Sequence, residues 1–168
     1  MMFMQPSDNG LDALLKLDNQ FCFALYALSR RVTALYRPLL QELGLTYPQY
    51  LVMLVLWESQ GDASPEQFEG VPVKFVGERL QLDTGTLTPL LKRLESAGLL
   101  LRTRSSQDER EVLLRLTATA LQLKEKARVV PLQLVCNSGI PPDRLLHLQR
   151  ELQSLLALIG QDEKATSV

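Results

Sequence analysis

The chain has 168 residues, the length of one ordinary domain or of one domain with long extensions. A composition of 46% hydrophobic and 22% charged residues excludes a mainly disordered chain, and two cysteines exclude a disulfide-rich secreted scaffold. The net charge of −1 neither favours nor excludes a nucleic-acid partner. No apolar run reaches the roughly 18 residues of a membrane span, and the first residues do not resemble a signal peptide, so we expect a cytoplasmic protein without a membrane partner.

The N-terminal part is predicted to be helical. Apolar residues recur at helical spacing over 11–42, which predicts one long helix, bent near Pro38. Thr46 is suited to cap a second helix over 47–60. The polar stretch 61–70 follows and is typical of an exposed loop.

The middle of the chain is predicted to form a winged helix-turn-helix. Pro72 is suited to a first helical position and opens a short helix, and Asp83 or Thr84 caps the next one. Two strand-like runs, 99–104 and 112–116, flank a polar loop and predict a β-hairpin. A hairpin directly after two such helices is a wing, and the second helix is the one that enters the DNA major groove.

The C-terminal part is predicted to be helical again. Thr117 is expected to cap a helix that continues to about Val135, and Asp143 to cap a last helix with a leucine-rich stripe. The apolar stripes of the terminal helices exceed what a small winged module can cover, so we expect a two-fold dimer with interlocked terminal helices. An intramolecular bundle is the alternative. The predicted fold is mainly α with a small β-hairpin wing, with dimerisation helices at 11–45 and 117–160 and a DNA-binding module at 46–116.

Basic side chains gather where this arrangement places the DNA. The segment from Pro89 to Arg104 carries four basic residues against one acidic residue, a net charge of +3 that suits a polyanion. Threonines in the first turns of the second helix can reach base edges, and basic residues can reach phosphates or the minor groove; solvated surface charge is the alternative. The candidates for DNA contact are Thr84, Thr86, Thr88, Lys92, Arg93, Arg102, Arg104 and Arg110. Asp108 is expected to shape the wing by orienting Arg110, because an acid repels phosphate.

Several motifs resemble the MarR family of dimeric winged-helix regulators, and within it the organic hydroperoxide resistance regulators (OhrR). They are, in chain order, 21–26 (FCFALY), 45–50 (LTYPQY), 77–80 (GERL), 83–95 (DTGTLTPLLKRLE) and 108–110 (DER). The similarity covers about 19–128. It departs in two places: the stretch 61–71 is longer than usual and is expected to decorate the surface, and Thr84 stands where the family has Ser.

The resemblance implies that Cys22 senses organic hydroperoxides. A lone cysteine on a helical stripe is more often a small core residue, but this one matches the family's sensor, whose thiolate attacks a peroxide oxygen and becomes a sulfenic acid. Tyr26 is one helical turn from Cys22, whereas Tyr36 is about 21 Å along a continuous helix and can reach a sensing thiol only across a dimer. The resemblance implies that Tyr36 and Tyr47 hydrogen-bond the thiolate of the partner subunit; amphipathic rim residues are the alternative.

Cys136 is the one remaining cysteine and a candidate resolving residue. Some members of this branch form an intersubunit disulfide between the sensor and a C-terminal cysteine, which implies the pair Cys22 and Cys136 here. A free or buried Cys136, with a small-thiol cap on Cys22, is the alternative. The resemblance thus implies a homodimeric repressor that binds an inverted repeat of operator DNA when reduced and releases it when oxidised.

Nothing in the sequence points to a metal, a cofactor or an enzyme. The one histidine, His147, is expected to be exposed or to face the dimer. A MarR-type repressor released by a small phenolic ligand is one alternative function, and the substitution Cys22→Ser separates the two, because only peroxide release needs the thiol. A thiol peroxidase with Cys22 as nucleophile and Cys136 as resolver is another, but it has no use for a basic winged module.

Overall fold

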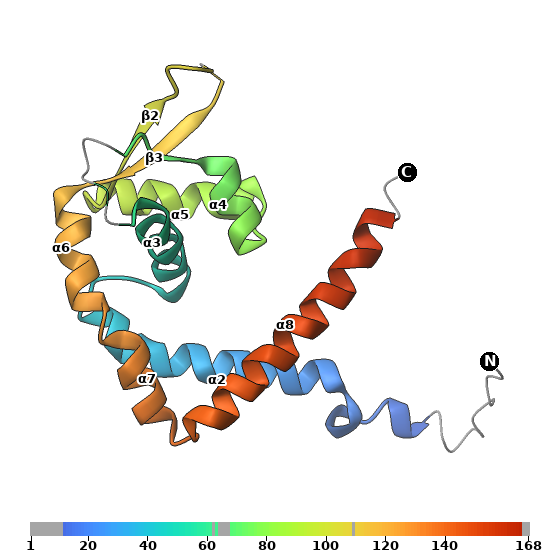
Figure 1. Ribbon diagram of the computed structural model, residues 1–168. Helices are drawn as coiled ribbons and strands as arrows, with labels where there is room; N and C mark the ends of the chain where they lie inside the picture. Colours follow the sequence, from blue (N-terminus) through green and yellow to red (C-terminus); the bar gives the residue numbers. More distant parts are fainter. Residues whose placement is uncertain (1–11, 62, 64–67, 109, 166–168) are drawn as a thin grey trace. The chain divides into compact units, whose positions relative to one another are not determined.

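The structure is a computed structural model that describes residues 12–61, 63, 68–108 and 110–165. It is mainly helical, as predicted, with one small antiparallel sheet (Figure 1). The chain divides into two compact units, Met1–Arg128 and Val129–Val168. None of the helices in the described part is both long and apolar enough for a membrane crossing.

The first unit contains the predicted winged module. Its elements are η1 (Leu17–Asn19), α2 (Phe21–Gln41), α3 (Tyr47–Gln60), β1 (Val71–Pro72), α4 (Val73–Leu80), α5 (Thr84–Ser96), β2 (Leu100–Arg104), β3 (Val112–Leu116) and α6 (Ala118–Ala127). The second unit consists of α7 (Val130–Ser138) and α8 (Pro142–Ala165).

The long helix predicted over 11–42 is interrupted before Phe21. Leu11, where the prediction began, lies outside the described residues. The side-chain amides of Asn19 and Gln20 donate hydrogen bonds to the backbone carbonyls of Ala13 and Leu14, and these bonds compete with helical ones. Gln20 adopts an extended conformation (φ −86°, ψ 107°), so α2 starts as a separate helix one residue later.

Helix α3 is the centre of the first unit, with α4, α5 and the sheet around it (Figure 1). Its N-terminus is held by Gln49, whose side-chain oxygen accepts a hydrogen bond of 2.8 Å from the backbone N–H of Thr46. The core residues that α3 supplies are Tyr50, Val52, Met53, Val55, Leu56 and Trp57. Leu87, Leu91 and Leu94 of α5 and Leu100, Leu114 and Leu116 of the sheet are buried as well, and α3 contacts both α5 and β3. This core fixes α5 and the wing on one scaffold.

The sheet has the order β1-β3-β2, and β2 pairs with β3 in the register Leu100↔Leu116 to Arg104↔Val112. The hairpin was predicted, but β1 was not, because two residues are too short for an alternating pattern. Pro72 pairs with Leu113 in this strand, so α4 begins one residue later than predicted. Gly70 (φ +115°) precedes β1 at a point where a Cβ atom would lie 2.9 Å from the Leu114 carbonyl oxygen, which excludes a side chain there.

The helix predicted from Thr117 to Val135 is divided in two. Helix α6 ends at Ala127, and α7 starts at Val130 with Pro131 in its first turn. A proline lacks the N–H that would continue the helix, and its ring clashes with the carbonyl four residues earlier, here that of Ala127. The prediction of one continuous helix is therefore wrong. The border between the two units falls at this break.

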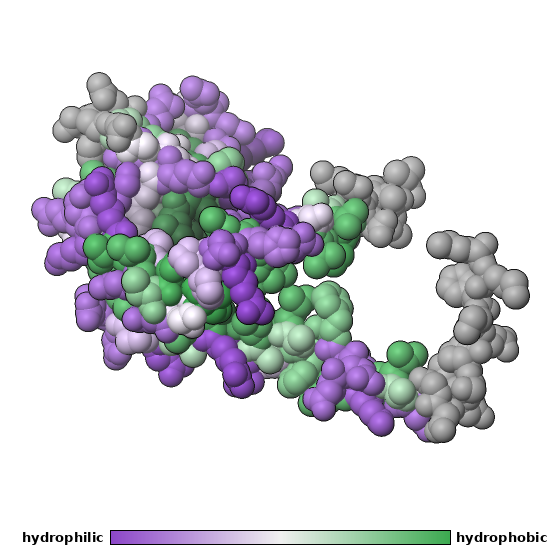
Figure 2. All heavy atoms as spheres, turned by 60° about the horizontal axis from the view of Figure 1, so that its bottom comes forward, coloured by the Kyte–Doolittle hydropathy of each residue, from purple (hydrophilic) through white to green (hydrophobic). Residues whose placement is uncertain are grey.

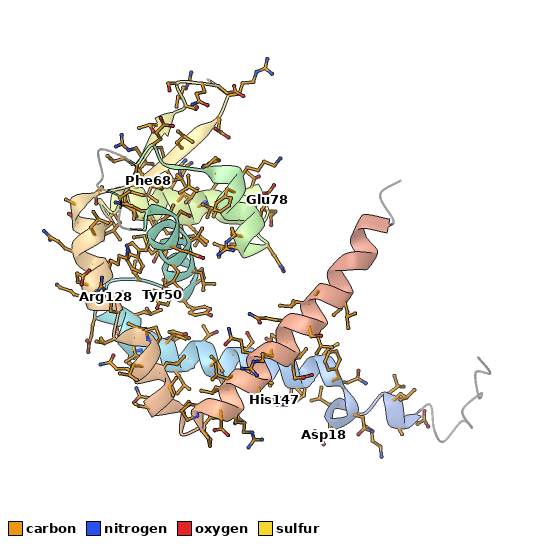
Figure 3. All side chains as sticks on the ribbon, in the orientation of Figure 1. Asp18, Tyr50, Phe68, Glu78, Arg128 and His147 are labelled. Carbon is orange, nitrogen blue, oxygen red and sulfur yellow. The ribbon has the colours of Figure 1, made fainter. Side chains whose placement is uncertain are left out.

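Many large apolar side chains remain exposed in the single chain, and the face drawn in Figure 2 has green, hydrophobic areas among purple, hydrophilic ones. In the first unit they include Leu14, Leu15, Leu17, Phe21, Phe23 and Leu28. In the second unit they include Leu132, Leu146, Leu148, Leu155, Leu156, Leu158 and Ile159. His147 is also exposed, on α8 (Figure 3). Apolar surface of this extent is typical of helices that pack against another chain.

Candidate functional site

Helix α5 presents three threonines in its first turns. Thr84 is its first residue and is exposed. The Thr86 hydroxyl donates a hydrogen bond of 2.7 Å to one carboxylate oxygen of Asp83, and the other carboxylate oxygen accepts the Thr86 backbone N–H at 2.9 Å. These bonds lower the pKa of Asp83, because they stabilise its charged form. The Thr88 hydroxyl donates to the Thr84 carbonyl at 2.7 Å.

The basic candidates differ in the exposure of their side chains and in whether they form ion pairs. Lys92 and Arg93 are exposed on α5, and neither forms an ion pair with another described residue. Arg104 is exposed at the end of β2. Arg102 is different: its side chain is only 25% exposed, and its Nε lies 3.2 Å from Glu95 Oε2 in an ion pair without a hydrogen bond. Arg102 thus joins the wing to α5 by an ion pair.

The tip of the wing is held by side chain–backbone hydrogen bonds. Asp108 Oδ1 accepts the backbone N–H of Arg110 at 2.9 Å, so it fixes the backbone of Arg110 rather than its guanidinium; Glu109, between them, lies outside the described residues. The buried Ser105 hydroxyl accepts the backbone N–H groups of Gln107 and Asp108. Ser105 was not singled out from the sequence, since a serine next to a polar loop gives no sign of burial.

Cys22 is the second residue of α2, and its thiol is exposed. Phe21 and Phe23 beside it are exposed as well and make the surroundings apolar. One turn later, the Tyr26 hydroxyl accepts a hydrogen bond of 3.4 Å from Arg30, whose guanidinium carbon lies 5.5 Å from the centre of the Tyr26 ring. Cys22 is thus accessible to an apolar reactant.

A cluster of tyrosines lies where the C-terminal half of α2 meets the start of α3. The ring centres of Tyr36 and Tyr47 are 4.8 Å apart, and those of Tyr36 and Tyr50 are 5.9 Å apart. Burial raises the pKa of Tyr36 to about 12, with further contributions from Tyr47 and Tyr50, and burial also raises the pKa of those two. All three are therefore phenols at neutral pH and can donate hydrogen bonds.

Tyr50 belongs to this cluster and had no role in the sequence-based prediction. It is 1% exposed and points from α3 towards α2 (Figure 3). The signal was its position three residues after Tyr47, on the same face of a helix.

Cys136 is in the second unit, near the end of α7, and its thiol is exposed. Gly139 then ends this helix in a left-handed conformation.

Comparison with known proteins gives consistent matches. The family model described as transcriptional regulator SarA/Rot matches residues 34–127. The chain is 47% identical over 154 residues to the organic hydroperoxide resistance transcriptional regulator of Bacillus subtilis (strain 168), and the match covers 92% of this chain and 98% of that relative.

Solved structures of AbfR from Staphylococcus epidermidis have the same fold. Reduced AbfR bound to DNA is 32% identical, with a TM-score of 0.68 and coverage of 89% of this chain and 98% of that one. Disulfide-formed AbfR is 33% identical, with a TM-score of 0.56 and coverage of 89% and 99%. The matches extend over nearly the whole of these chains, so the chain belongs to the MarR family of transcriptional regulators, in the branch of the organic hydroperoxide resistance regulators.

Proposed function

We propose that this protein is a homodimeric repressor that binds operator DNA when reduced and releases it when an organic hydroperoxide oxidises Cys22. The observation that carries the proposal is an exposed thiol in apolar surroundings at one end of α2, with a cluster of protonated phenols towards the other end of the same helix. The name of the Bacillus subtilis relative and the reduced, DNA-bound state of AbfR support it.

The sensing step is a two-electron oxidation of the thiolate. The sulfur of Cys22 attacks the distal oxygen of the hydroperoxide, an S–O bond forms and the O–O bond breaks. The leaving alkoxide takes a proton from a neighbouring phenol or from water and becomes an alcohol. Tyr36 and Tyr47 donate hydrogen bonds to the thiolate of Cys22 of the partner subunit, since Tyr36 is about 21 Å from the Cys22 of its own helix, and Tyr26 supports the site from within the chain.

The second step is a disulfide with Cys136 of the partner subunit. The Cys136 thiol condenses with the sulfenic acid, an S–S bond forms and water leaves. The exposure of Cys136 and the glycine that ends α7 support this role. AbfR bound to DNA was solved in an overoxidised as well as a reduced state, and a separate structure has the disulfide formed, which favours the disulfide as the releasing form.

The DNA interface consists of α5 in the major groove and the β2–β3 wing beside it. Thr84, Thr86 and Thr88 face bases or nearby phosphates. Lys92, Arg93, Arg104 and Arg110 contact phosphates or the minor groove, Arg102 supports the wing through Glu95 as well as through its charge, and Asp108 shapes the tip. A two-fold dimer then reads an inverted repeat with one winged module (46–116) on each half-site.

The dimer is formed by the helical regions at 11–45 and 117–160. Their exposed leucines and phenylalanines support this assignment, because a partner chain is the natural means of burying them. Dimerisation also completes the sensor, since it brings the tyrosines of one subunit to the thiol of the other.

The experiment that tests the proposal measures operator binding by fluorescence anisotropy before and after one equivalent of cumene hydroperoxide. We expect the wild type to lose operator binding, Cys22→Ser to retain it, and Cys136→Ser to lose it less completely, without the crosslinked dimer on a non-reducing gel. Release of Cys22→Ser by the hydroperoxide would overturn the proposal. A crosslinked dimer in Cys136→Ser would exclude Cys136 as the resolving thiol.

A further inference from the structure

Four aromatic side chains form a row from the core of the winged module to the tyrosines of the proposed sensor. The ring centres of Trp57 and Tyr50 are 6.4 Å apart, in an edge-to-face arrangement. Tyr50 in turn lies 5.9 Å from Tyr36, and Tyr36 lies 4.8 Å from Tyr47. These distances are within the range of favourable aromatic pairs. Tyr50 is the tyrosine of this row to which the proposed function gives no role.

The side chain of Tyr50 is held firmly in place. It is fully buried and points from α3 towards α2 (Figure 3). Its neighbour Trp57 is anchored as well, because the indole N–H donates a hydrogen bond of 3.0 Å to the Ala120 carbonyl of α6. A buried ring in a close-packed core, beside an anchored neighbour, has little room for another rotamer. Tyr50 is therefore a rigid point on α3.

Tyr36 depends on this rigid point for its own orientation. Tyr36 comes from the other helix, α2, and its side chain is only partly buried. Tyr47 and Tyr50 are three residues apart on the same face of α3, so the Tyr36 ring packs against both of them. Tyr47 is the first residue of α3 and is also only partly buried, whereas Tyr50 is fully buried. The firmer of the two contacts of Tyr36 is thus the one with Tyr50.

The orientation of Tyr36 matters because a hydrogen bond depends on direction. A phenol that samples several rotamers donates to a given acceptor for only part of the time, whereas a fixed phenol is always in position. We infer that Tyr50 is a positioning residue of the sensor, whose ring holds Tyr36 in the rotamer that donates to the thiolate of Cys22 of the partner subunit. Tyr50 acts only through Tyr36. This inference rests on the proposed function and adds a residue of the α3 core to it.

The test follows the rate of Cys22 oxidation by cumene hydroperoxide as a function of pH, in a Cys136→Ser background that leaves one cysteine. A hydrogen bond to the thiolate favours the charged form, so its loss moves the rise of the rate to higher pH. We expect Tyr50→Leu, which removes the ring, to move the midpoint of this rise up by about one pH unit, with an oxidation rate on the order of 10-fold lower below the midpoint. Tyr50→Phe keeps the ring and should retain the wild-type profile.

A double-mutant cycle separates positioning from general damage to the fold. In a Tyr36→Phe background the hydroxyl that Tyr50 positions is absent, so Tyr50→Leu should not move the midpoint any further. Val52→Ala is the matched control, because Val52 is buried on the opposite side of α3 from Tyr50, and this variant should keep the wild-type midpoint. A wild-type midpoint in Tyr50→Leu would overturn the inference, as would shifts that simply add in the double variant.

A second measurement reports the position of Tyr36 without any peroxide chemistry. The chain has four tyrosines, so fluorine NMR of the protein labelled with fluorotyrosine gives few resonances, and the one that is lost in Tyr36→Phe belongs to Tyr36. We expect this resonance to move towards that of free fluorotyrosine in Tyr50→Leu and to stay in place in Val52→Ala. Tyr50→Met has a flexible apolar side chain that fills more of the space, and it carries the same expectation if Tyr50→Leu does not fold.

The two measurements together distinguish failure of this inference from failure of the proposed function. A Tyr36 resonance that moves in the Tyr50 variants supports the positioning role even if the hydroperoxide leaves Cys22 intact, in which case the proposed function alone fails. An unchanged resonance in these variants, with Cys22 still oxidised by the hydroperoxide, would overturn the inference and leave the proposed function standing.

Discussion

The hydrogen bond from the Thr86 hydroxyl to Asp83 limits which groups of the DNA this side chain can contact. The hydroxyl proton is used in the bond to Asp83, so towards the DNA the side chain presents lone pairs and a methyl group. Lone pairs in the major groove accept hydrogen bonds from the amino groups of adenine or cytosine. The proposed role of Thr86 is therefore that of an acceptor, positioned by Asp83.

The substitution Thr86→Val tests this role, because it keeps the shape and removes the hydroxyl. We expect a loss of roughly 3- to 10-fold in affinity for the operator, the value of one neutral hydrogen bond. The salt dependence of binding should not change, since no phosphate contact is lost. Anisotropy titrations at several salt concentrations measure both quantities, and Thr86→Ser is the control that retains the hydroxyl. Unchanged operator affinity in Thr86→Val would refute the role.

The raised pKa of Tyr36 predicts how stability depends on pH. Its pKa is about 12 in the folded chain against 10.0 for an ordinary tyrosine, so the folded state holds its proton over this interval while the unfolded state loses it. The resulting contribution of Tyr36 to the free energy of unfolding is fully present below pH 10.0 and is lost as the pH rises towards about 12. Tyr36→Phe has no proton to lose, so its free energy of unfolding should fall less steeply over the same interval. Urea denaturation at neutral and alkaline pH measures the slope, and identical slopes in the two proteins would contradict the assignment.

At the scale of elements, α3 and α6 are joined by a buried hydrogen bond. The indole N–H of Trp57, which is 4% exposed, donates to the Ala120 carbonyl at 3.0 Å. Lys124 of α6 lies 3.3 Å from the Gly61 carbonyl and 3.5 Å from the Trp57 carbonyl, at the C-terminal end of α3, where a positive charge is favourable. These contacts attach α6 to the core of the winged module.

The substitution Trp57→Phe removes the donor of this bond, while the Ala120 carbonyl keeps its helical partner, the backbone N–H four residues later. We expect a loss of about 0.5–1.5 kcal/mol in the free energy of unfolding, the net value of one hydrogen bond. Chemical denaturation followed by circular dichroism measures it. Lys124→Met serves as a comparison, because its contacts are at the edge of the core and its loss should cost less. A larger cost for Lys124→Met would contradict this ranking.

The elements also show what the sequence can and cannot predict. Helix α3, the hairpin and the cap of α5 by Asp83 follow local rules, so they were predicted closely. The break at Pro131 also follows a local rule, since proline interrupts a helix, but the prediction gave more weight to the apolar pattern. The break before Phe21 depends on side-chain hydrogen bonds, which the spacing of apolar residues does not reveal. Strand β1 forms only because β3 offers it a partner, and Tyr50 meets Tyr36 only through the packing of α3 against α2. Such features are set by tertiary contacts.

At the scale of the whole molecule, the central feature is apolar surface without a partner in one chain. Helix α8 has a stripe that includes the exposed side chain of Leu155, whereas Ala157 lies on the opposite side of the helix. We expect Leu155→Glu to weaken the dimer by at least an order of magnitude, because a buried carboxylate without a partner is costly. Ala157→Glu introduces the same charge and should leave the dimer intact. Sedimentation at several concentrations measures the association, and equal dimer stability in both variants would argue against α8 as an interface.

In the proposed function, oxidation of Cys22 controls operator binding. The most direct measurement follows both quantities in one titration, with operator binding read by anisotropy and the oxidation state of Cys22 by mass spectrometry as organic hydroperoxide is added in fractions of an equivalent. We expect the loss of DNA binding and the loss of the free thiol to coincide, and reduction with dithiothreitol to restore both. Full oxidation of Cys22 with the operator still bound, or release while the thiol is intact, would contradict the proposed function.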